Sequence, residues 1–294
     1  MVDANYSKIS LPSKSALSRK RVVLVVSVFI SLIFLTFLLH NTYRPQFGLA
    51  DEQVVAPDEV GIIAKVKPSE IAIVMAYDDK ETHYLPRSRQ NKEEYAIKHG
   101  YKFLQDGVYD KSRGPAWGKI LTLRKFMKMY PSIKWFWWID VDTVLMDSTI
   151  ALEDHVLVNI TNPEYSHKDM IIAYDCNGFN AGSFFIRNTP WSLDFLAKIY
   201  QPQYSTRFGY AEQGAMQHLY ETSLEVAEHF YFVPQNTINA FPEEACGDED
   251  GIHAFKEGDF IVHLAGCWVG SRNNCVQRFN EYWDRRIPAS PEQA

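Results

Sequence analysis

The sequence has 294 residues, of which 46% are hydrophobic and 22% charged, and its formal net charge is −6. These fractions exclude a mainly disordered chain, and the length leaves room for one α/β domain of about two hundred residues plus extensions. Five basic residues and one acid give residues 1–21 a charge of +4, so the remainder carries −10, which argues against a nucleic-acid partner and is compatible with cation binding.

An unbroken apolar run of eighteen residues at 22–39 directly follows the basic residues at 19–21. As a helix it would be about 27 Å long, which nearly crosses the hydrocarbon core of a bilayer. The positive-inside rule then places the tail, residues 1–21, in the cytosol and the rest of the chain on the lumenal side. A cleaved signal peptide is the alternative, but the run exceeds the usual ~7–15 residues. We therefore expect a retained signal anchor.

Residues 40–68 contain three prolines and little periodicity, so they are predicted to be a stem, followed by a folded domain at 69–288 and a tail at 289–294. Strands are predicted at 70–77, 101–104, 169–174, 184–186, 230–233 and 260–264, with an aromatic strand that starts at Trp135. Helices are predicted after Pro86, ending at His99-Gly100, and at 117–130, 149–157, 191–200 and 212–221. Strands that alternate with helices indicate a largely parallel sheet covered on both faces.

Two acids, Asp140 and Asp142, end the aromatic strand. Because side chains alternate along a strand, both acids leave it on the same side and can converge on one cation. Such a position is where open α/β sheets bind ligands, and hard oxygen ligands suit Mg²⁺ or Mn²⁺ bridging to a diphosphate. No glycine-rich phosphate loop is present, so a metal would take over that role, and a nucleotide sugar is the substrate expected. The alternative is a strand end followed by a helix cap.

Several other polar positions each have a functional and a structural interpretation. His263 ends a short apolar strand and is either a core residue or a third metal ligand. Lys119 is either a solvated charge or a cation aimed at the phosphate or base of a nucleotide. Glu212 and Gln213 open a predicted helix, where an acid is favourable without any catalytic role. The segment 177–183 is either a tight turn or a place where the backbone approaches a ligand closely.

All four cysteines, Cys176, Cys246, Cys267 and Cys275, follow the predicted anchor, in a compartment where disulfides persist. Four cysteines allow three pairings, and the sequence does not choose among them, although the neighbours Cys267 and Cys275 are the first pair to expect. The absence of a C-x-x-C pair makes zinc a poor interpretation. Asn159 begins a glycosylation acceptor triplet on the lumenal side.

Seven blocks in a fixed order cover residues 70 to 285 approximately. They are Tyr95-Ala96 with His99-Gly100-Tyr101, Ala116-Trp117-Gly118-Lys119, Leu123-Arg124, Trp137-Trp138-Ile139-Asp140-Val141-Asp142, Phe179-Asn180-Ala181-Gly182-Ser183-Phe184 with Arg187-Asn188, Glu212-Gln213, and His263-Leu264-Ala265-Gly266-Cys267. Together they resemble glycosyltransferase family 34, the fungal Golgi α-1,2-galactosyltransferases and α-1,6-mannosyltransferases with the plant xyloglucan xylosyltransferases. The resemblance implies a GT-A fold, in which a Rossmann-like nucleotide-binding α/β sheet continues into an acceptor-binding half. It also implies one N-terminal transmembrane helix, a single-pass type II topology in the Golgi membrane and a lumenal catalytic domain.

The resemblance also assigns roles to individual residues. It implies that Asp140, Asp142 and His263 bind Mn²⁺ (or Mg²⁺), the metal bridging to the donor. The implied donor contacts are Ala76, Tyr77, Lys119, Asp140, Asn180 and Gly182. Gln213 would lie beside the anomeric carbon, and Gln213 and Glu212 would stabilise the positive sugar of a front-face reaction, since no residue stands out as a nucleophile.

The implied function is that of a retaining, metal-dependent hexosyltransferase acting on mannan-type N- or O-glycans of glycoproteins. UDP-galactose is the favoured donor, because the Ala-Trp-x-Lys and Asn-Ala-Gly-Ser-Phe blocks look closer to the galactosyl branch. The alternatives are an α-1,6-mannosyltransferase that uses GDP-mannose, and a weakly active subunit of a Golgi mannan-synthesising complex. A metal-dependent nucleotidyltransferase or phosphoesterase would also use paired acids, but the expected membrane anchor makes it remote.

Overall fold

We describe a computed structural model of the chain at residues 63–78, 82–107, 111–204, 211–242, 244–246, 251–267 and 274–289. The predicted cytosolic tail, anchor and most of the stem lie outside these residues. None of the helices within the described ranges has the length and apolar character needed to span a bilayer.

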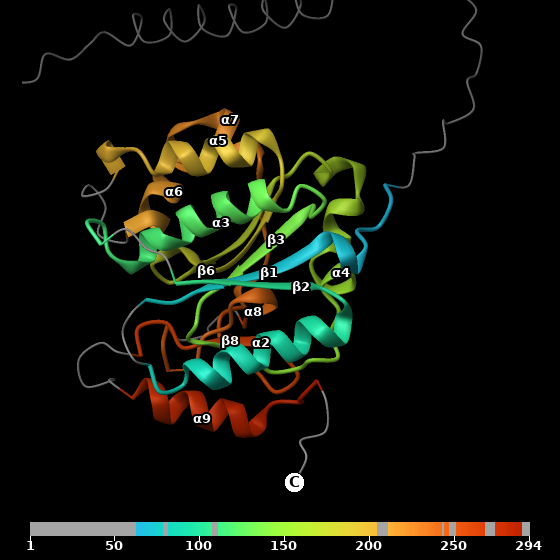
Figure 1. The fold of residues 1–294 in the computed structure, drawn as a ribbon, viewed down its shortest axis with the longest axis vertical. Coiled ribbons are helices and arrows are strands. Elements are labelled where there is room, and N and C mark those ends of the chain that lie inside the picture. The colour runs from blue at the N-terminus through green and yellow to red at the C-terminus, as the bar shows by residue number, and fades with distance from the viewer. Residues whose placement is uncertain are drawn as a thin grey trace, which may run out of the picture. The chain divides into compact units, whose positions relative to one another are not determined.

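A six-stranded sheet forms the centre of the fold (Figure 1), with strand order β2-β1-β3-β6-β5-β7. Its strands are β1 (Ile71–Ala76), β2 (Lys102–Asp106), β3 (Trp135–Ile139), β5 (Met170–Asp175), β6 (Gly178–Arg187) and β7 (Phe230–Phe232). β1 pairs in parallel with β2 and β3, and β5 with β7, whereas β6 is antiparallel to both β3 and β5. Five strands therefore run in the same direction, as predicted for a largely parallel sheet, and only β6 is reversed, because β5 and β6 form a hairpin with a two-residue turn at 176–177.

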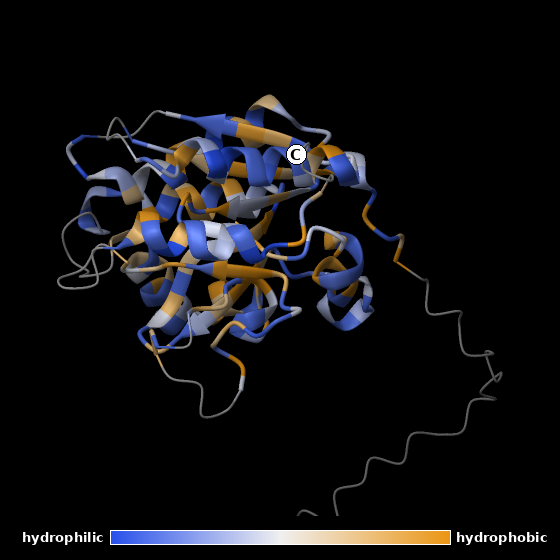
Figure 2. Cartoon of the chain, turned by 90° about the horizontal axis from the view of Figure 1, so that it is seen from below, coloured by the Kyte–Doolittle hydropathy of each residue, from blue (hydrophilic) through white to orange (hydrophobic). Residues whose placement is uncertain are grey.

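Helices cover both faces of this sheet. α3 (Gly118–Met129), α5 (Pro190–Ile199), α6 (Ala211–Thr222) and α7 (Leu224–Glu228) lie on one side, and α2 (Leu85–His99), α8 (Gln235–Ile238) and α9 (Cys275–Arg285) lie on the other (Figure 1). Alternate residues of β1 therefore enter two cores: Ala72 and Val74 pack with α3, α5 and α6, while Ile71 and Ile73 pack with α2. Figure 2 shows hydrophobic stretches along the strands and hydrophilic residues over much of the helices.

The aromatic strand is confirmed as β3, and all five of its residues are buried. Because both faces are covered, its sequence is continuously apolar rather than alternating. Each large side chain contributes about 1.5–3 kcal/mol when fully buried. The buried strand therefore holds the residues that follow its carboxyl end in fixed positions.

A second, two-stranded sheet pairs β4 (Thr143–Leu145) with β8 (Ile261–His263), and α9 packs against it. Neither β4 nor α9 was predicted. The helix expected at 149–157 is instead the short α4 (Leu152–His155), followed by a 3₁₀ segment at Leu157–Thr161. Asn159 lies in this segment, and its glycosylation stays a prediction.

Local signals at two places are confirmed. Gly100 ends α2 in the left-handed conformation, with φ of 75°, as predicted for a C-cap. The four cysteines form the pairs Cys267–Cys275, which was the first pairing expected, and Cys176–Cys246.

Candidate active site

A cavity of about 1110 Å³ opens at the carboxyl ends of β1 and β3. All ten residues singled out from the sequence line it: Ala76, Tyr77, Lys119, Asp140, Asp142, Asn180, Gly182, Glu212, Gln213 and His263. Pockets for drug-sized molecules usually measure about 300–1000 Å³. This cavity is slightly larger than that range, so it has room for a ligand larger than a single sugar. The sequence therefore identified residues that the fold brings to one place.

Asp140 and Asp142 lie in the turn between β3 and β4, beyond the last strand residue, Ile139. The N–H of Asp140 donates to the carbonyl of Gly182 at 2.7 Å, and its own carbonyl accepts from the N–H of Thr143 at 3.3 Å. The expected reason for their convergence, alternation along a strand, is therefore wrong. The helix-cap alternative is wrong too, because the strand β4 follows the turn.

Pairing of β4 with β8 brings His263 to these acids. Thr143 is the cross-strand partner of His263. As a result, ligand atoms of Asp140, Asp142 and His263 all lie within 4.8 Å of one another. Asp142 is 7% and His263 4% exposed, so two of the three groups are buried at the base of the cavity.

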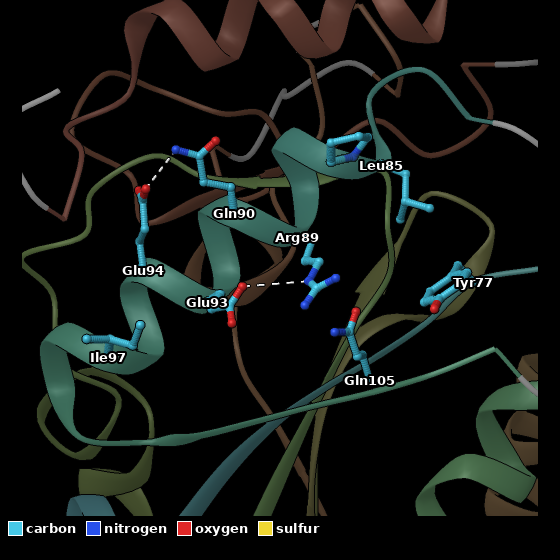
Figure 3. A pocket seen from close by; sticks show the side chains of 9 residues that line it. Tyr77, Leu85, Arg89, Gln90, Glu93, Glu94, Ile97 and Gln105 are labelled. Carbon is cyan, nitrogen blue, oxygen red and sulfur yellow. Dashed lines mark hydrogen bonds and ion pairs between the residues drawn. The ribbon is translucent and has the colours of Figure 1, made fainter. Parts of the chain in front are cut away.

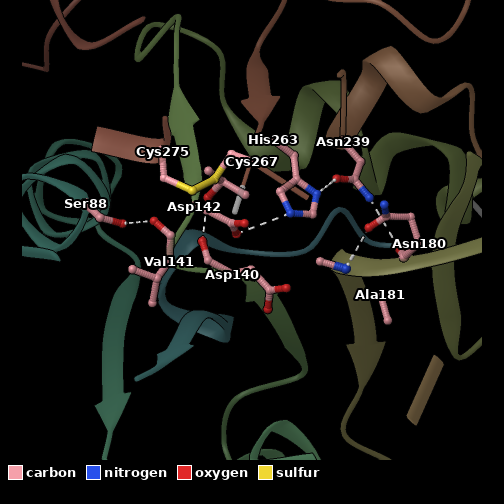
Figure 4. Close-up of polar contacts among 12 residues, drawn as sticks. Ser88, Asp140, Val141, Asp142, Asn180, Ala181, Asn239, His263, Cys267 and Cys275 are labelled. Carbon is pink, nitrogen blue, oxygen red and sulfur yellow. Dashed lines mark hydrogen bonds and ion pairs between the residues drawn. A yellow bond between two sulfur atoms is a disulfide. The ribbon is translucent and has the colours of Figure 1, made fainter. Parts of the chain in front are cut away.

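The hydrogen bonds of His263 fix which ring nitrogen faces the acids (Figure 4). Nδ1 lies 2.7 Å from the side-chain oxygen of Asn239, and Nε2 lies 3.3 Å from Oδ1 of Asp142. Because an amide oxygen only accepts, Nδ1 carries a proton and donates it, which leaves the Nε2 lone pair directed at Asp142 in the neutral ring. Two electron-rich atoms in contact require a proton or a metal ion between them.

The mutual contact of His263 and Asp142 shifts the pKa of both side chains. Burial lowers the pKa of His263, but the charge and hydrogen bond of Asp142 outweigh it and raise the pKa above 6.5. Burial raises the pKa of Asp142, but His263 outweighs it and the net shift is downward. Two carboxylates and one imidazole fit a divalent cation, and the imidazole suits Mn²⁺ better than Mg²⁺.

Lys119 of α3 is buried beside this cluster rather than solvated. Its Nζ lies 2.8 Å from Glu212 and 3.5 Å from Asp140, and it donates to the carbonyl of Ala181 at 2.6 Å. Burial lowers the pKa of Lys119, but Asp140 and Glu212 outweigh it and the net shift is upward, so the side chain stays charged. Trp138 donates from Nε1 to Asp140 at 2.6 Å and orients that carboxylate.

Residues 178–183 are the start of β6 rather than a free turn. A Cβ on Gly182 would lie 2.1 Å from Cε1 of His263, so only glycine allows the ring to occupy its position. Asn180 accepts from the N–H of Gly182 at 2.9 Å, and Gln213 accepts from the N–H of Ala181 at 3.2 Å. The backbone of this segment thus closely approaches the His263 ring, and its expected approach to a ligand stays a prediction.

Sequence reasoning missed Asn239, which is fully buried and orients His263. Its only signal is an amide in the short apolar stretch Ile238-Asn239-Ala240. The disulfide of Cys176 and Cys246 was also not assigned to the site, although Cys246 lines the cavity.

A second cavity, of about 520 Å³, lies on the outer face of α2 (Figure 3). Arg89 pairs there with Glu93 at 3.6 Å, and Gln90 donates to Glu94 at 2.7 Å. Both contacts are ordinary i,i+4 pairs on a helix surface. The second cavity shares Tyr77 and Leu85 with the first, but Asp140, Asp142 and His263 do not line it.

Comparisons with known proteins agree with this description. The model of the galactosyl transferase GMA12/MNN10 family matches residues 67–275. An "Uncharacterized alpha-1,2-galactosyltransferase" of Schizosaccharomyces pombe is 32% identical over 231 residues, 66% of each chain. The "Probable alpha-1,6-mannosyltransferase MNN10" of Saccharomyces cerevisiae is 33% identical over 217 residues, which cover 62% of this chain and 55% of that protein. The chain thus spans about half to two thirds of the length of these relatives.

Another relative, the "Probable alpha-1,2-galactosyltransferase gmh1" of Schizosaccharomyces pombe, is 30% identical over 256 residues, 75% of each chain. Among solved structures, a glycosyltransferase involved in the glycosylation of the major capsid of PBCV-1 aligns with a TM-score of 0.56 and 16% identity, over 72% of this chain and 98% of that chain. That likeness supports a GT-A-like α/β fold. The family match and these relatives show that the chain belongs to the galactosyl transferase GMA12/MNN10 family, glycosyltransferase family 34.

Proposed function

We propose that the chain transfers a hexose from a nucleotide sugar to a mannan-type glycan of glycoproteins, with retention of configuration and with Mn²⁺ (or Mg²⁺) as cofactor. The observation that carries the proposal is the group of Asp140, Asp142 and His263 at the base of the large cavity, of which Asp142 and His263 are buried. Such a group is costly to bury unless a cation compensates its charge. A diphosphate on the open side of that cation would complete its coordination.

Asp140, Asp142 and His263 would hold the metal, which when bound supplies a Lewis acid for the departing diphosphate. Lys119 adds a second positive charge to the same region. Its ion pair with Glu212 and its bond to the carbonyl of Ala181 fix the ammonium group, so it is oriented before the donor binds. The direct role of Glu212 is therefore to hold the ammonium group of Lys119 in place.

The donor would extend from the end of β1, at Ala76 and Tyr77, across Lys119 and Asp140 to Asn180 and Gly182. Gln213 would lie beside the anomeric carbon and, with Glu212, stabilise the positive sugar of a front-face substitution. Gln213 already accepts a hydrogen bond from the N–H of Ala181, which holds its amide in place at the cavity wall.

We favour UDP-galactose as donor and α-1,2-galactosyl transfer as the reaction, in line with the names of two of the relatives above. GDP-mannose and α-1,6-mannosyl transfer form the second candidate, supported by the name of the yeast relative. A weakly active subunit of a Golgi mannan-synthesising complex is a third. The proposed setting is the Golgi membrane, with residues 1–21 cytosolic, 22–39 as anchor, 40–68 as stem and 69–288 as the lumenal catalytic domain.

The test is a panel of UDP- and GDP-sugars offered to the full chain, purified in detergent, with Mn²⁺ and a mannan acceptor. Released nucleotide and the labelled glycan are both measured. The proposal expects transfer from one donor that stops when EDTA is added and returns with Mn²⁺. Transfer that EDTA does not affect would contradict the metal role, and no transfer from any donor by protein that binds Mn²⁺ would favour the complex-subunit alternative.

A further inference from the structure

The inner face of α2 carries three polar side chains that do not line the large cavity. Ser88 and Lys92 are fully buried, and Asn91 is 6% exposed. Residues three and four apart share one face of a helix, so the three side chains point together toward the segment 141–145. This segment includes Asp142 and leads into β4.

Each of these side chains bonds to the backbone of that segment. Ser88 donates to the carbonyl of Val141 at 2.5 Å (Figure 4), and Lys92 donates to the carbonyl of Thr143 at 2.5 Å and to the hydroxyl of Ser88 at 2.8 Å. Asn91 accepts from the N–H of Leu145 at 2.8 Å and donates to its carbonyl at 3.1 Å. The carbonyls on both sides of Asp142 are therefore held by α2.

The position of Lys92 is costly for the fold. Its Nζ forms no ion pair with a carboxylate of the described residues, and burial lowers its pKa to about 7 although Asp142 and Asp140 raise it. A buried ammonium group without a carboxylate in contact recovers only part of the hydration energy that it loses. An apolar side chain of similar length would fill the same volume at less cost, so the lysine needs a reason other than packing.

The neighbouring residues supply that reason. Val141 separates the two acids, and Thr143 both follows Asp142 and pairs with His263 across the two-stranded sheet. A shift of the 141–143 backbone would therefore move both acids relative to His263. Because the turn itself is stabilised by the bonds of Thr143 to the carbonyl of Asp140, the bonds from α2 fix where the turn lies rather than whether it forms.

We propose that Lys92 and Ser88 are positioning residues, which set the placement of the Asp140–Val141–Asp142 turn against His263 and thereby the affinity for the divalent cation. The inference rests on the metal site of the proposed function. Ligands that are held in place by surrounding bonds bind a metal more tightly, and loss of such support typically costs about 10- to 100-fold in affinity.

The experiment measures Mn²⁺ binding to the full chain, purified in detergent, by the electron paramagnetic resonance signal of free Mn²⁺, without donor or acceptor. Lys92→Met keeps the length of the side chain and removes its donors. We expect its dissociation constant for Mn²⁺ to rise by about 10- to 100-fold. Ser88→Ala removes the bond to the carbonyl of Val141 and one acceptor of Lys92, but leaves the bond of Lys92 to Thr143 in place, so it should give a smaller rise, roughly three- to tenfold.

Tyr95→Phe is the matched control. Tyr95 is a buried residue of the same helix and donates to the carbonyl of Ile150 at 2.7 Å, beyond the two-stranded sheet. Its loss should lower the melting temperature and leave Mn²⁺ affinity within about twofold of wild type. If Lys92 had only a structural role, Lys92→Met would behave like Tyr95→Phe: the melting temperature would fall and the Mn²⁺ affinity would stay near that of wild type.

The outcomes separate the inference from the proposed function. If wild-type protein binds no Mn²⁺, the metal site itself is refuted. If it binds, but folded Lys92→Met and Ser88→Ala bind equally well, or Tyr95→Phe weakens binding as much as they do, the positioning role is refuted. Should Lys92→Met fail to fold, the Mn²⁺ affinity of Ser88→Ala is compared with those of wild type and Tyr95→Phe: unchanged affinity in Ser88→Ala, or an equal loss in Tyr95→Phe, refutes the positioning role.

Discussion

Two aspartate–histidine pairs, one buried and one in which only the aspartate is buried, lie at opposite ends of the strands of the main sheet, and their surroundings differ. At the carboxyl end of β3, Asp142 and His263 face a second carboxylate, Asp140, and a cavity. Ahead of β5, Asp169 accepts from His229 at 2.7 Å and Thr189 at 3.2 Å, and Arg187 lies 3.8 Å away.

The difference lies in the balance of donors and acceptors. Asp169 is surrounded by donors, and the ring of His229 stacks on Trp191 with centroids 3.9 Å apart. Neither Asp169 nor His229 lines either of the two cavities described. In the cavity, Asp140 is contacted by Trp138 and Lys119, but Asp142 faces Nε2 of His263, which is itself an acceptor in the neutral ring. An aspartate–histidine pair is thus a metal-site candidate because of excess acceptors and open access, and not because of the pair alone.

The largest effect should come from Asp142→Asn, which keeps the size of the side chain. Loss of a charged ligand should reduce kcat/KM at least about a thousandfold, since a metal Lewis acid is worth several kcal/mol in the transition state. Mn²⁺-dependent transfer from the donor found in the panel is the measurement, with circular dichroism as the check of folding. Activity within tenfold of wild type would remove Asp142 from the metal site.

Gly182→Ala should have the next largest effect. The added Cβ would lie 2.1 Å from the His263 ring, so the ring must move and Mn²⁺ affinity should fall about 10- to 100-fold. Ser183→Ala is the neighbouring control, because Ser183 bonds to Trp137 inside the core instead. Equal Mn²⁺ affinities for the two variants would show that the ring position does not matter.

Lowering the pH should weaken Mn²⁺ binding by about tenfold per unit below the pKa of His263, because a proton and the metal compete for Nε2. That pKa lies above 6.5 in the metal-free protein: burial lowers it, but Asp142 raises it more. By the same linkage, the stability that His263 gives the metal-free protein is full below 6.5 and is lost as the pH rises through the raised pKa. Titrations of Mn²⁺ between about pH 5.5 and 8.5 test this, and a flat affinity would contradict it.

The smallest effect on activity is expected for Asp169→Asn. Weakening the charged hydrogen bonds to His229 and Thr189 should lower the free energy of unfolding by about 1.5–3 kcal/mol. Activity well below the melting temperature should stay within about twofold of wild type. Denaturant unfolding measures the free energy of unfolding, and the transfer assay measures activity. A large loss of activity in folded Asp169→Asn would show that the pair of Asp169 and His229 is not purely structural.

The sequence predicted the parts of the fold that have strong local signals. The aromatic run of β3, the period of α3 and the C-cap at Gly100 depend on neighbouring residues only, and all three are confirmed. β4 was not predicted because a strand of three residues is too short to show an alternating polar and apolar pattern. The direction of β6 was missed because it depends on a two-residue turn at 176–177.

The site was predicted by residue but not by geometry. The ten residues do line one cavity, yet the two acids converge through a turn and the pairing of β4 with β8. Asn239, Ser88 and Lys92 could not be found, since an isolated polar residue gains meaning only from a partner far away in sequence. Lys92, for example, bonds to a carbonyl 51 positions later.

The disulfide of Cys176 and Cys246 has a practical consequence. It fastens the hairpin of β5 and β6 to a segment 70 positions later, on the wall of the cavity. Recombinant protein made in a reducing bacterial cytosol would lack this fastening, so preparations from such hosts can look inactive for reasons unrelated to the metal. A host that secretes the chain through an oxidising pathway is the appropriate source of material.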